Sequence, residues 1–214
     1  MNETSPPLRR TRVKICGITR EEDLQVAVAA GADALGFVLW PGSQRAIGLE
    51  RLAELSAQVP AFVTRVGLFV DQEPALIQQA GRYLDLLQFH GNEAPDDCRG
   101  FARPWIKALR MREDIDVTQA ASRYADASAL LLDAYRPGVP GGTGETFDWS
   151  RIPASLTKPV ILAGGLTPQN VGEAIRTVHP FAVDVSGGVE HGPGIKDADR
   201  INEFIDQVCF SHSQ

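Results

Sequence analysis

The feature that most constrains the fold of this chain is a repeated unit, in which a short apolar stretch is followed by an amphipathic one. About eight such units follow one another along the chain. Continuous apolar runs are typical of strands that are buried on both faces of a parallel sheet. We therefore predict a single α/β domain, a (β/α)8 TIM barrel, over residues 12–210. An open doubly wound sheet has the same local pattern, but a series of this length without an odd edge strand favours closure.

The predicted strands and helices alternate along the chain. The strands cover residues 12–16, 34–39, 65–70, 86–89, 105–109, 129–132, 159–163 and 181–185. The helices cover residues 21–30, 49–59, 73–83, 94–101, 114–124, 148–152, 168–178 and 197–208. Thr19, Asp71 and Thr167 are the predicted N-caps of three helices, and Gly31 is the residue that ends the first helix. Residues 1–11 are polar and contain prolines, so we expect a disordered lead-in.

Composition and charge argue against several classes of partner. A formal net charge of −6 without a basic cluster gives no support for nucleic-acid binding. No apolar run approaches the length of a membrane span, and the start of the chain does not resemble a signal peptide. Cys16, Cys98 and Cys209 lie far apart and form neither a disulfide framework nor a metal-ligand spacing. We therefore expect a cytoplasmic protein with no metal site. The sequence leaves open whether the protein is a monomer or a homodimer, and the partner that we expect is a small molecule.

The candidate functional residues follow the strands at their carboxyl ends. In a (β/α)8 barrel these ends face one common mouth. The glycine pair after the seventh strand and the Ser-Gly-Gly run after the eighth leave backbone N–H groups free to bind an anion, and this is the recurrent phosphate site of the fold. Tight turns without a ligand are the alternative reading of these glycines. The residues collected at the mouth are Cys16, Arg45, His90, Asp133, Gly164, Gly165, Asp184, Ser186, Gly187 and Gly188.

Cys16 and Asp133 end two strands on opposite sides of this mouth, so a thiol and a carboxyl group could act there as base and acid. A free thiol titrates at about 8.5, and Lys14, on the same strand face, could lower the pKa of Cys16. Burial at the end of an apolar run could keep Asp133 partly protonated. The alternatives are a buried structural cysteine and an aspartate that caps a helix or forms a loop salt bridge.

Two further charged groups have weaker signals. Arg45 lies in a polar loop beside small residues, which suits bidentate binding of a carboxylate. A solvated surface arginine is the alternative. Asp184 precedes the Ser-Gly-Gly run, and together with Lys14 it could form only a buried ion pair.

Short motifs along the chain resemble, in order, those of the phosphoribosylanthranilate isomerase family. They extend from residue 12 to about residue 208, so the resemblance covers essentially the whole predicted domain. One motif alone is a weak signal, but the ordered set is highly specific. The motifs are KICGIT at 14–19, LGF at 35–37, SQR at 43–45, VGLFV at 66–70, QFHGNE at 88–93, LD at 132–133, GGTG at 141–144, FDW at 147–149, LAGGLTPQNV at 162–171, DVSGGVE at 184–190 and GIKD at 194–197.

The resemblance implies an Amadori rearrangement in tryptophan biosynthesis, without metal or cofactor. N-(5-phosphoribosyl)anthranilate would become 1-(2-carboxyphenylamino)-1-deoxyribulose 5-phosphate. Asp133 would protonate the furanose ring oxygen, and Cys16 would remove the C2′ proton. Arg45 would hold the anthranilate side of the substrate, the two glycine loops would hold its phosphate, and Asp184 would have a positioning role. His90 matches the family motif at the end of the fourth strand, so we expect it among the substrate-binding residues.

The sequence departs from the family pattern at two positions. Gly187 stands where a second serine is common, which would remove a hydroxyl contact to phosphate but keep the N–H, and Phe89 replaces a more usual leucine. Other readings are a different sugar-phosphate isomerase or lyase on a phosphate-binding barrel, and a non-catalytic sugar-phosphate-binding barrel. Indole-glycerol-phosphate synthase would require a catalytic lysine at a strand end, where this chain has Cys16. A redox protein would require a second thiol near Cys16.

Overall fold

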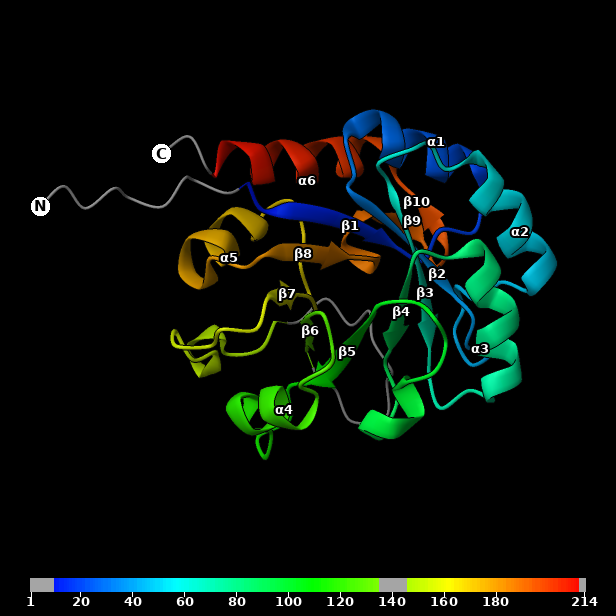
Figure 1. Cartoon of the computed structure of the whole chain (residues 1–214). Helices are drawn as coiled ribbons and strands as arrows, with labels where there is room; N and C mark the ends of the chain where they lie inside the picture. Colours follow the sequence, from blue (N-terminus) through cyan, green and yellow to red (C-terminus); the bar gives the residue numbers. More distant parts are fainter. Residues whose placement is uncertain (1–9, 135–145, 212–214) are drawn as a thin grey trace, which may run out of the picture.

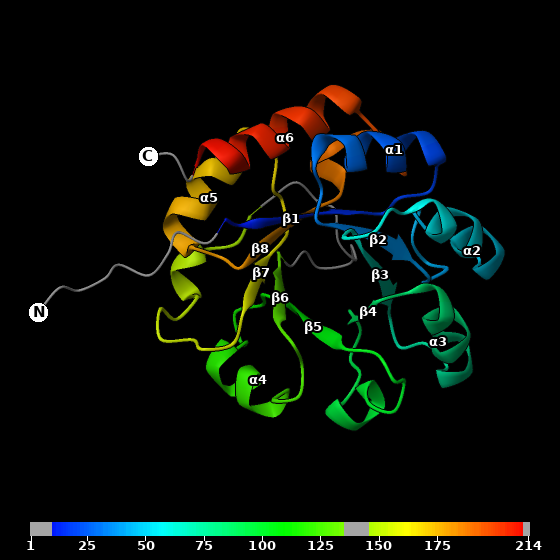
Figure 2. The same ribbon diagram turned by 45° about the horizontal axis from the view of Figure 1, so that its top comes forward.

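The computed structural model describes residues 10–134 and 146–211 of the chain. In this part of the chain the strands β1 to β8 form a closed barrel, in which each strand pairs with the next in sequence order and β8 pairs with β1. The pairs are parallel, and the helices lie around the outside of the barrel (Figures 1 and 2). The structure confirms the predicted (β/α)8 fold.

The observed elements follow the predicted order. The barrel strands are β1 (Arg12–Cys16), β2 (Ala34–Val38), β3 (Thr64–Phe69), β4 (Leu86–Phe89), β5 (Trp105–Arg110), β6 (Leu130–Asp133), β7 (Val160–Leu162) and β8 (Ala182–Val185). The α-helices are α1 (Glu21–Ala30), α2 (Leu49–Gln58), α3 (Pro74–Ala80), α4 (Val117–Arg123), α5 (Val171–Val178) and α6 (Ala198–Phe210). Short 3-10 turns are η1 (Gly81–Tyr83), η2 (Pro95–Cys98), η3 (Trp149–Arg151) and η4 (Gly187–Val189). A hairpin of β9 (Glu190–Gly192) and β10 (Ile195–Lys196), which the sequence reading did not predict, follows η4.

Alternation along each strand sorts its side chains between two cores. Val13 and Ile15 of β1 belong to the large cluster between the barrel and the helices. Ala108, Leu131 and Ile161 belong to a smaller cluster inside the barrel. Successive side chains of a strand point to opposite faces. A residue that lies two positions after one of these interior residues on the same strand therefore also faces the barrel axis. This alternation directs the side chains at the carboxyl ends of β1, β6 and β8 into the barrel mouth.

Several helices are shorter than predicted, and in one of them a polar side chain caps a later start. The helix predicted over 114–124 begins at Val117, and the carboxylate of Asp116 caps it by accepting the N–H groups of Thr118 and Gln119 at 2.8 and 3.0 Å. The helix predicted from 168 begins at Val171. The predicted helices over 94–101 and 148–152 are only the single turns η2 and η3.

The predictions of Thr19, Asp71 and Thr167 as N-caps are wrong. Each of these residues forms its hydrogen bond with a loop residue or a local turn and does not cap the helix that follows it. Thr19 donates its hydroxyl to the Gly194 carbonyl at 2.6 Å, and Asp71 accepts the Asn92 N–H at 2.7 Å. Thr167 donates its backbone N–H to the Asn170 side chain at 2.8 Å. Short polar side chains serve loop contacts as readily as helix caps, and sequence cannot distinguish the two uses. The prediction for Gly31 is confirmed, since it ends α1 in the left-handed conformation with φ 100°.

The lead-in predicted over residues 1–11 is packed at its end. Residues 1–9 lie outside the described residues. Arg10 donates to the Asp33 carboxylate at 2.9 Å, and Thr11 is buried with its hydroxyl 3.3 Å from the Pro180 carbonyl oxygen. Packing therefore begins at least two residues before the predicted domain boundary. Residues 135–145, which include the GGTG motif at 141–144, also lie outside the described residues.

The last helix, α6, packs along the barrel between α1 and α5 (Figures 1 and 2). Its buried face contains Phe204, which has no exposed surface, whereas Phe210 at the end of the helix is 64% exposed. We predict that Phe204→Ala lowers the free energy of unfolding by about 3–5 kcal/mol, because it leaves a cavity in the core. Phe210→Ala is the matched control and should change it by at most about 0.5 kcal/mol. Urea unfolding measures both, and equal effects of the two variants would contradict this packing.

Candidate active site

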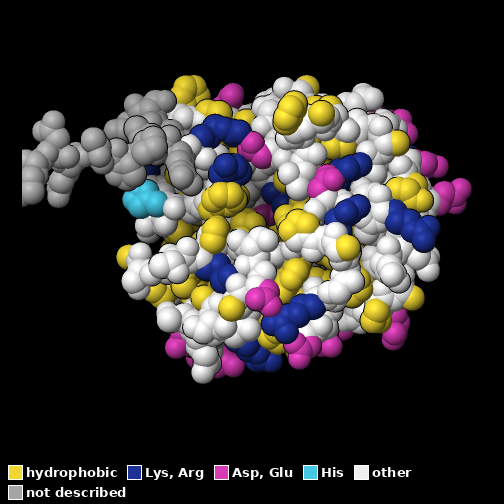
Figure 3. Space-filling model, viewed as in Figure 1, with side chains coloured by type: hydrophobic (Ala, Val, Ile, Leu, Met, Phe, Trp, Pro, Cys, Tyr) yellow, Lys and Arg dark blue, Asp and Glu magenta, His cyan; other side chains and the backbone are white. Residues whose placement is uncertain are grey.

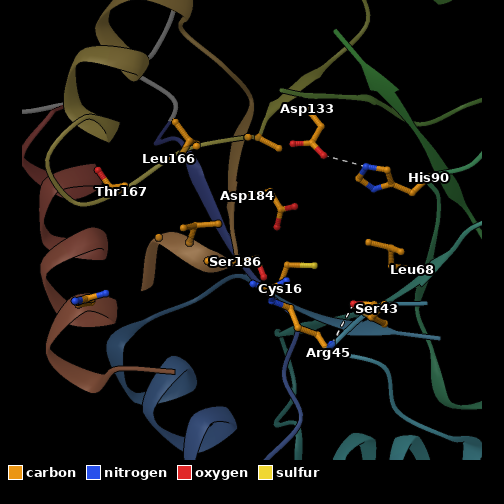
Figure 4. Close-up of a pocket in the computed structure, with 18 of the residues that line it drawn as sticks. Cys16, Ser43, Arg45, Leu68, His90, Asp133, Leu166, Thr167, Asp184 and Ser186 are labelled. Carbon is orange, nitrogen blue, oxygen red and sulfur yellow. Dashed lines mark hydrogen bonds and ion pairs between the residues drawn. The ribbon is translucent and has the colours of Figure 1, made fainter. Parts of the chain in front are cut away.

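The mouth of the barrel holds a cavity of about 560 Å³. It is lined by residues that follow the carboxyl ends of the strands, as shown in Figure 4. The lining includes all ten candidate residues from the sequence, which are Cys16, Arg45, His90, Asp133, Gly164, Gly165, Asp184, Ser186, Gly187 and Gly188. A cavity of this size is in the range of small-molecule sites. The structure thus brings the candidates together, while their individual roles stay predictions.

Cys16 and Asp133 end strands β1 and β6 and contribute their side chains to the same cavity. Both residues are buried, with 5% and 7% of their surface exposed. In Figure 4 Asp184, from β8, lies between them. A substrate bound in this cavity would therefore lie beside both a thiol and a carboxyl group.

The thiol of Cys16 lies in a buried, charged environment. Burial raises its pKa above the ordinary value, and the nearby ammonium of Lys14 lowers it by a smaller amount. Lys14 is itself paired with Asp184, whose carboxylate oxygen is 2.8 Å from its Nζ. The predicted effect of Lys14 on the pKa of Cys16 is therefore present but is outweighed by burial, which favours the neutral thiol. The buried ion pair between Lys14 and Asp184, which the sequence suggested, is present.

Asp133 is oriented by a histidine from the neighbouring side of the barrel. His90 Nε2 is 3.1 Å from the Asp133 carboxylate, and the side-chain nitrogen of Gln88 is 3.0 Å from His90 Nδ1. With this assignment the amide of Gln88 donates to Nδ1, so the ring carries its proton on Nε2 and donates it to Asp133. His90, predicted among the substrate-binding residues, thus also holds the candidate acid in place.

Two glycines allow the loops after β6, β7 and β8 to approach one another closely. Gly164 has φ 81°, and a Cβ there would overlap the backbone of Ala134. A Cβ on Gly188 would overlap the carbonyl oxygen of Leu166. Among the described residues, no protein oxygen accepts the N–H groups of Gly165, Gly187 and Gly188. These amides are available to an anion at the edge of the cavity.

Arg45 is not a solvated surface arginine. Its guanidinium group is 17% exposed and forms a bidentate pair with Glu190, at 2.8 Å from Nε and 2.6 Å from Nη2. The hydrogen bond to Glu190 raises the pKa of Arg45 further above its ordinary value. The pairing fixes the plane of the guanidinium group, and its remaining N–H groups are left for a ligand.

Sequence reasoning missed several charged residues in or beside the cavity, among them Arg110, Glu190 and Lys196. Arg110, at the end of β5, lines the cavity and donates to the His90 carbonyl at 3.3 Å. Glu190 and Lys196 come from the β9–β10 hairpin, and both are buried. The glycines at 192 and 194 between these two charges are a turn signal that could have indicated the hairpin.

In residues 10–134 and 146–211, no group of three or more His, Cys, Asp or Glu side chains is arranged to hold a metal ion. Within the same ranges, no helix has the length and apolar character that a bilayer crossing would require.

Known proteins are similar to this chain in both sequence and fold. A family model described as N-(5′-phosphoribosyl)anthranilate (PRA) isomerase matches residues 13–207. The N-(5′-phosphoribosyl)anthranilate isomerase of Chromohalobacter salexigens is 70% identical over 208 residues, which are 97% of this chain and 98% of that protein.

Two crystal structures extend the similarity to three dimensions. The phosphoribosylanthranilate isomerase of Thermotoga maritima has a TM-score of 0.83 and 42% identity, covering 94% of this chain and 99% of the other. A phosphoribosylanthranilate isomerase in complex with reduced 1-(o-carboxyphenylamino)-1-deoxyribulose 5-phosphate has a TM-score of 0.79 and 40% identity, with the same coverage. Because the family model covers residues 13–207 and a relative is 70% identical over nearly the whole chain, this chain belongs to the N-(5′-phosphoribosyl)anthranilate isomerase family.

Proposed function

We propose that Cys16 and Asp133 are the base and the acid with which this chain carries out the reaction of its family in tryptophan biosynthesis. That reaction is the Amadori rearrangement of N-(5-phosphoribosyl)anthranilate to 1-(2-carboxyphenylamino)-1-deoxyribulose 5-phosphate. One observation supports these roles. A buried thiol, a buried carboxyl group, free backbone amides and a fixed guanidinium group all line one cavity.

The first step opens the sugar ring. Asp133 gives its proton to the furanose ring oxygen while the bond between that oxygen and C1′ breaks. Without this proton the leaving oxygen would carry a full negative charge. The nitrogen lone pair of the anthranilate group forms the new double bond to C1′, so the product of this step is a positively charged iminium. His90 holds the carboxyl group of Asp133 in place during the transfer.

The second step moves the double bond. Beside the positive iminium the Cys16 thiol first releases its own proton to solvent at the mouth of the barrel, because a nearby positive charge favours the thiolate and offsets the burial that raises the pKa of Cys16. The thiolate then removes the proton from C2′ and becomes a thiol again, while the electrons of that C–H bond form an enolamine and neutralise the iminium. The proton on C2′ lies next to an iminium carbon and is already acidified, so a modest base suffices. The enolamine then tautomerises to the ketone.

The remaining groups bind the two ends of the substrate. The amides of Gly165, Gly187 and Gly188 suit the phosphate, because their N–H groups have no protein acceptor among the described residues. The N–H groups of Arg45 that Glu190 leaves free suit the anthranilate carboxylate. Asp184 holds Lys14 beside the thiol and has a positioning role.

The chain acts on this small molecule in the cytoplasm, as a monomer or homodimer. All the groups assigned above come from one chain, and Cys16, Cys98 and Cys209 are free thiols, as a reducing compartment requires. On the face seen in Figure 3, the Lys and Arg side chains are interspersed with Asp and Glu. This mixture is unlike the continuous basic surface that binds nucleic acids.

Removing either proton-transfer group tests the assigned roles. We predict that Cys16→Ala and Asp133→Asn each lower turnover of phosphoribosylanthranilate by about 10²–10⁴-fold, because each removes one acid–base step. Loss of the fluorescence of phosphoribosylanthranilate generated in situ measures the rate, and circular dichroism checks that both variants fold. Near-normal turnover in either folded variant would show that its residue has another role.

A methyl group at Gly188 tests the phosphate loops. The added Cβ would overlap the Leu166 carbonyl and force the loops after β7 and β8 apart. We predict that Gly188→Ala raises KM at least about tenfold, because a shift of about 1 Å in a binding group is enough for such a loss. The control is Gly192→Ala, whose Cβ would have no neighbour within 4 Å. Steady-state kinetics distinguish them, and an unchanged KM in Gly188→Ala would place the phosphate elsewhere.

A further inference from the structure

The β9–β10 hairpin places two oppositely charged side chains directly behind the proposed reaction site. Glu190 begins β9 and Lys196 ends β10. Their side chains are only 4% and 1% exposed, and they form an ion pair of 2.9 Å between Lys196 Nζ and Glu190 Oε1. Neither residue lines the cavity, so neither one touches the substrate in the reaction described above.

Lys196 joins the strand that ends in the base to the loop that leads to the phosphate amides. Its Nζ donates to the Cys16 carbonyl at 2.6 Å and to the Ser186 carbonyl at 3.2 Å. Its backbone N–H donates to the Asp23 carboxylate of α1 at 3.1 Å. One ammonium group therefore sets the distance between the end of β1 and the turn that carries the glycines at 187 and 188.

Glu190 connects the same ammonium group to Arg45. Its two carboxylate oxygens accept the bidentate pair from Arg45 at 2.8 and 2.6 Å, and one of them also accepts the Gly194 N–H at 3.3 Å. Burial raises the pKa of Glu190, but the hydrogen bonds from Arg45 and Lys196 outweigh burial and lower it overall. The carboxylate is therefore charged and fixes the orientation of the guanidinium group.

A buried ion pair of this kind is not the usual way to stabilise a fold. Desolvation of two charges costs as much as their attraction returns, and apolar side chains of similar volume often serve stability as well or better. The Glu190–Lys196 pair instead has its contacts concentrated on Cys16, Ser186 and Arg45. These contacts indicate a role in placing the reacting and binding groups.

We propose that Glu190 and Lys196 are positioning residues for the isomerase reaction: Lys196 holds the Cys16 strand end against the Ser186 loop, and Glu190 holds Arg45. This inference rests on the proposed roles of Cys16 and Arg45. It assigns different consequences to the two residues, because Lys196 acts on the base and Glu190 acts on the group that binds the anthranilate carboxylate.

Loss of the Lys196 cation should have a specific effect on the pH dependence of kcat/KM, because this cation is one of the charges around Cys16. The charged groups that face the thiol are Lys14 from β1, Asp184 from β8, Lys196 from β10 and Arg45 from the loop after β2. Removal of the Lys196 cation raises the pKa of Cys16, since a positive charge favours the thiolate. The rising limb of kcat/KM against pH therefore moves to higher pH in a variant without this cation.

Steady-state kinetics with phosphoribosylanthranilate over a range of pH test the proposal in four variants. We expect Lys196→Met to lower kcat about 10–100-fold and to move the rising limb to higher pH. Lys196→Arg keeps the cation and should restore the position of that limb. Glu190→Gln should raise KM about tenfold or more while the limb stays in place. The control Arg65→Met removes a cation from the Arg65–Asp85 pair at the amino ends of β3 and β4, and should leave the kinetics unchanged.

Each outcome supports or overturns the proposal. Wild-type kinetics in Lys196→Met, or equal losses in both variants with no movement of the pH limb, would show a merely structural role. If Lys196→Met does not fold, the double variant Glu190→Gln/Lys196→Met replaces it, because this variant buries no unpaired carboxylate. Wild-type kinetics in the double variant overturn the proposal. An inactive wild-type enzyme would instead refute the proposed function, so the two failures are distinguishable.

Discussion

The pairing of β1 with β8 is the constraint on which the contacts around Cys16 depend. It brings together residues 170 positions apart in the sequence, so that Lys14 reaches Asp184 inside the barrel. It also places the carbonyl of Cys16 within reach of Lys196, which follows β8 by a short hairpin. Without this closure the first strand would be an edge strand, and the thiol would face no anion loop. The barrel therefore creates the site as well as the core.

Burial at the mouth of the barrel has opposite effects on the charged groups there. Burial raises the pKa of Cys16, which favours the neutral thiol. Lys14 and Arg45 keep their charges there because each has a carboxylate partner within 3 Å, and the pKa of each is raised. Burial lowers the pKa of Lys196, and its ion pair with Glu190 opposes that effect. The site thus combines charges held in ion pairs with one buried thiol. In the proposed reaction, the positively charged intermediate favours the thiolate form of that thiol.

The strand order and the ten candidate residues at the strand ends were predictable from sequence, because a buried parallel strand has a continuous apolar run and ends at a recognisable glycine or polar residue. The helix starts were not, since Thr19, Asp71 and Thr167 use their polar groups for contacts with loops distant in sequence or for a local turn. The roles of Glu190 and Lys196 were also hidden. The two residues lie in motifs that were visible in the sequence. The same sequence could form a surface hairpin with two solvated charges or a buried ion pair behind a thiol, and only the three-dimensional contacts distinguish these two structures.

The central claim is that Cys16 and Asp133 act on one sugar from within a cavity whose far end binds its phosphate. A crystal structure of this chain with reduced 1-(o-carboxyphenylamino)-1-deoxyribulose 5-phosphate tests that claim most directly. The account predicts the phosphate on the amides of Gly165, Gly187 and Gly188, the Cys16 sulfur beside C2′, and the Asp133 carboxyl group beside the oxygen that closed the ring. A phosphate bound at another part of the barrel, or a sugar that neither side chain contacts, would contradict it.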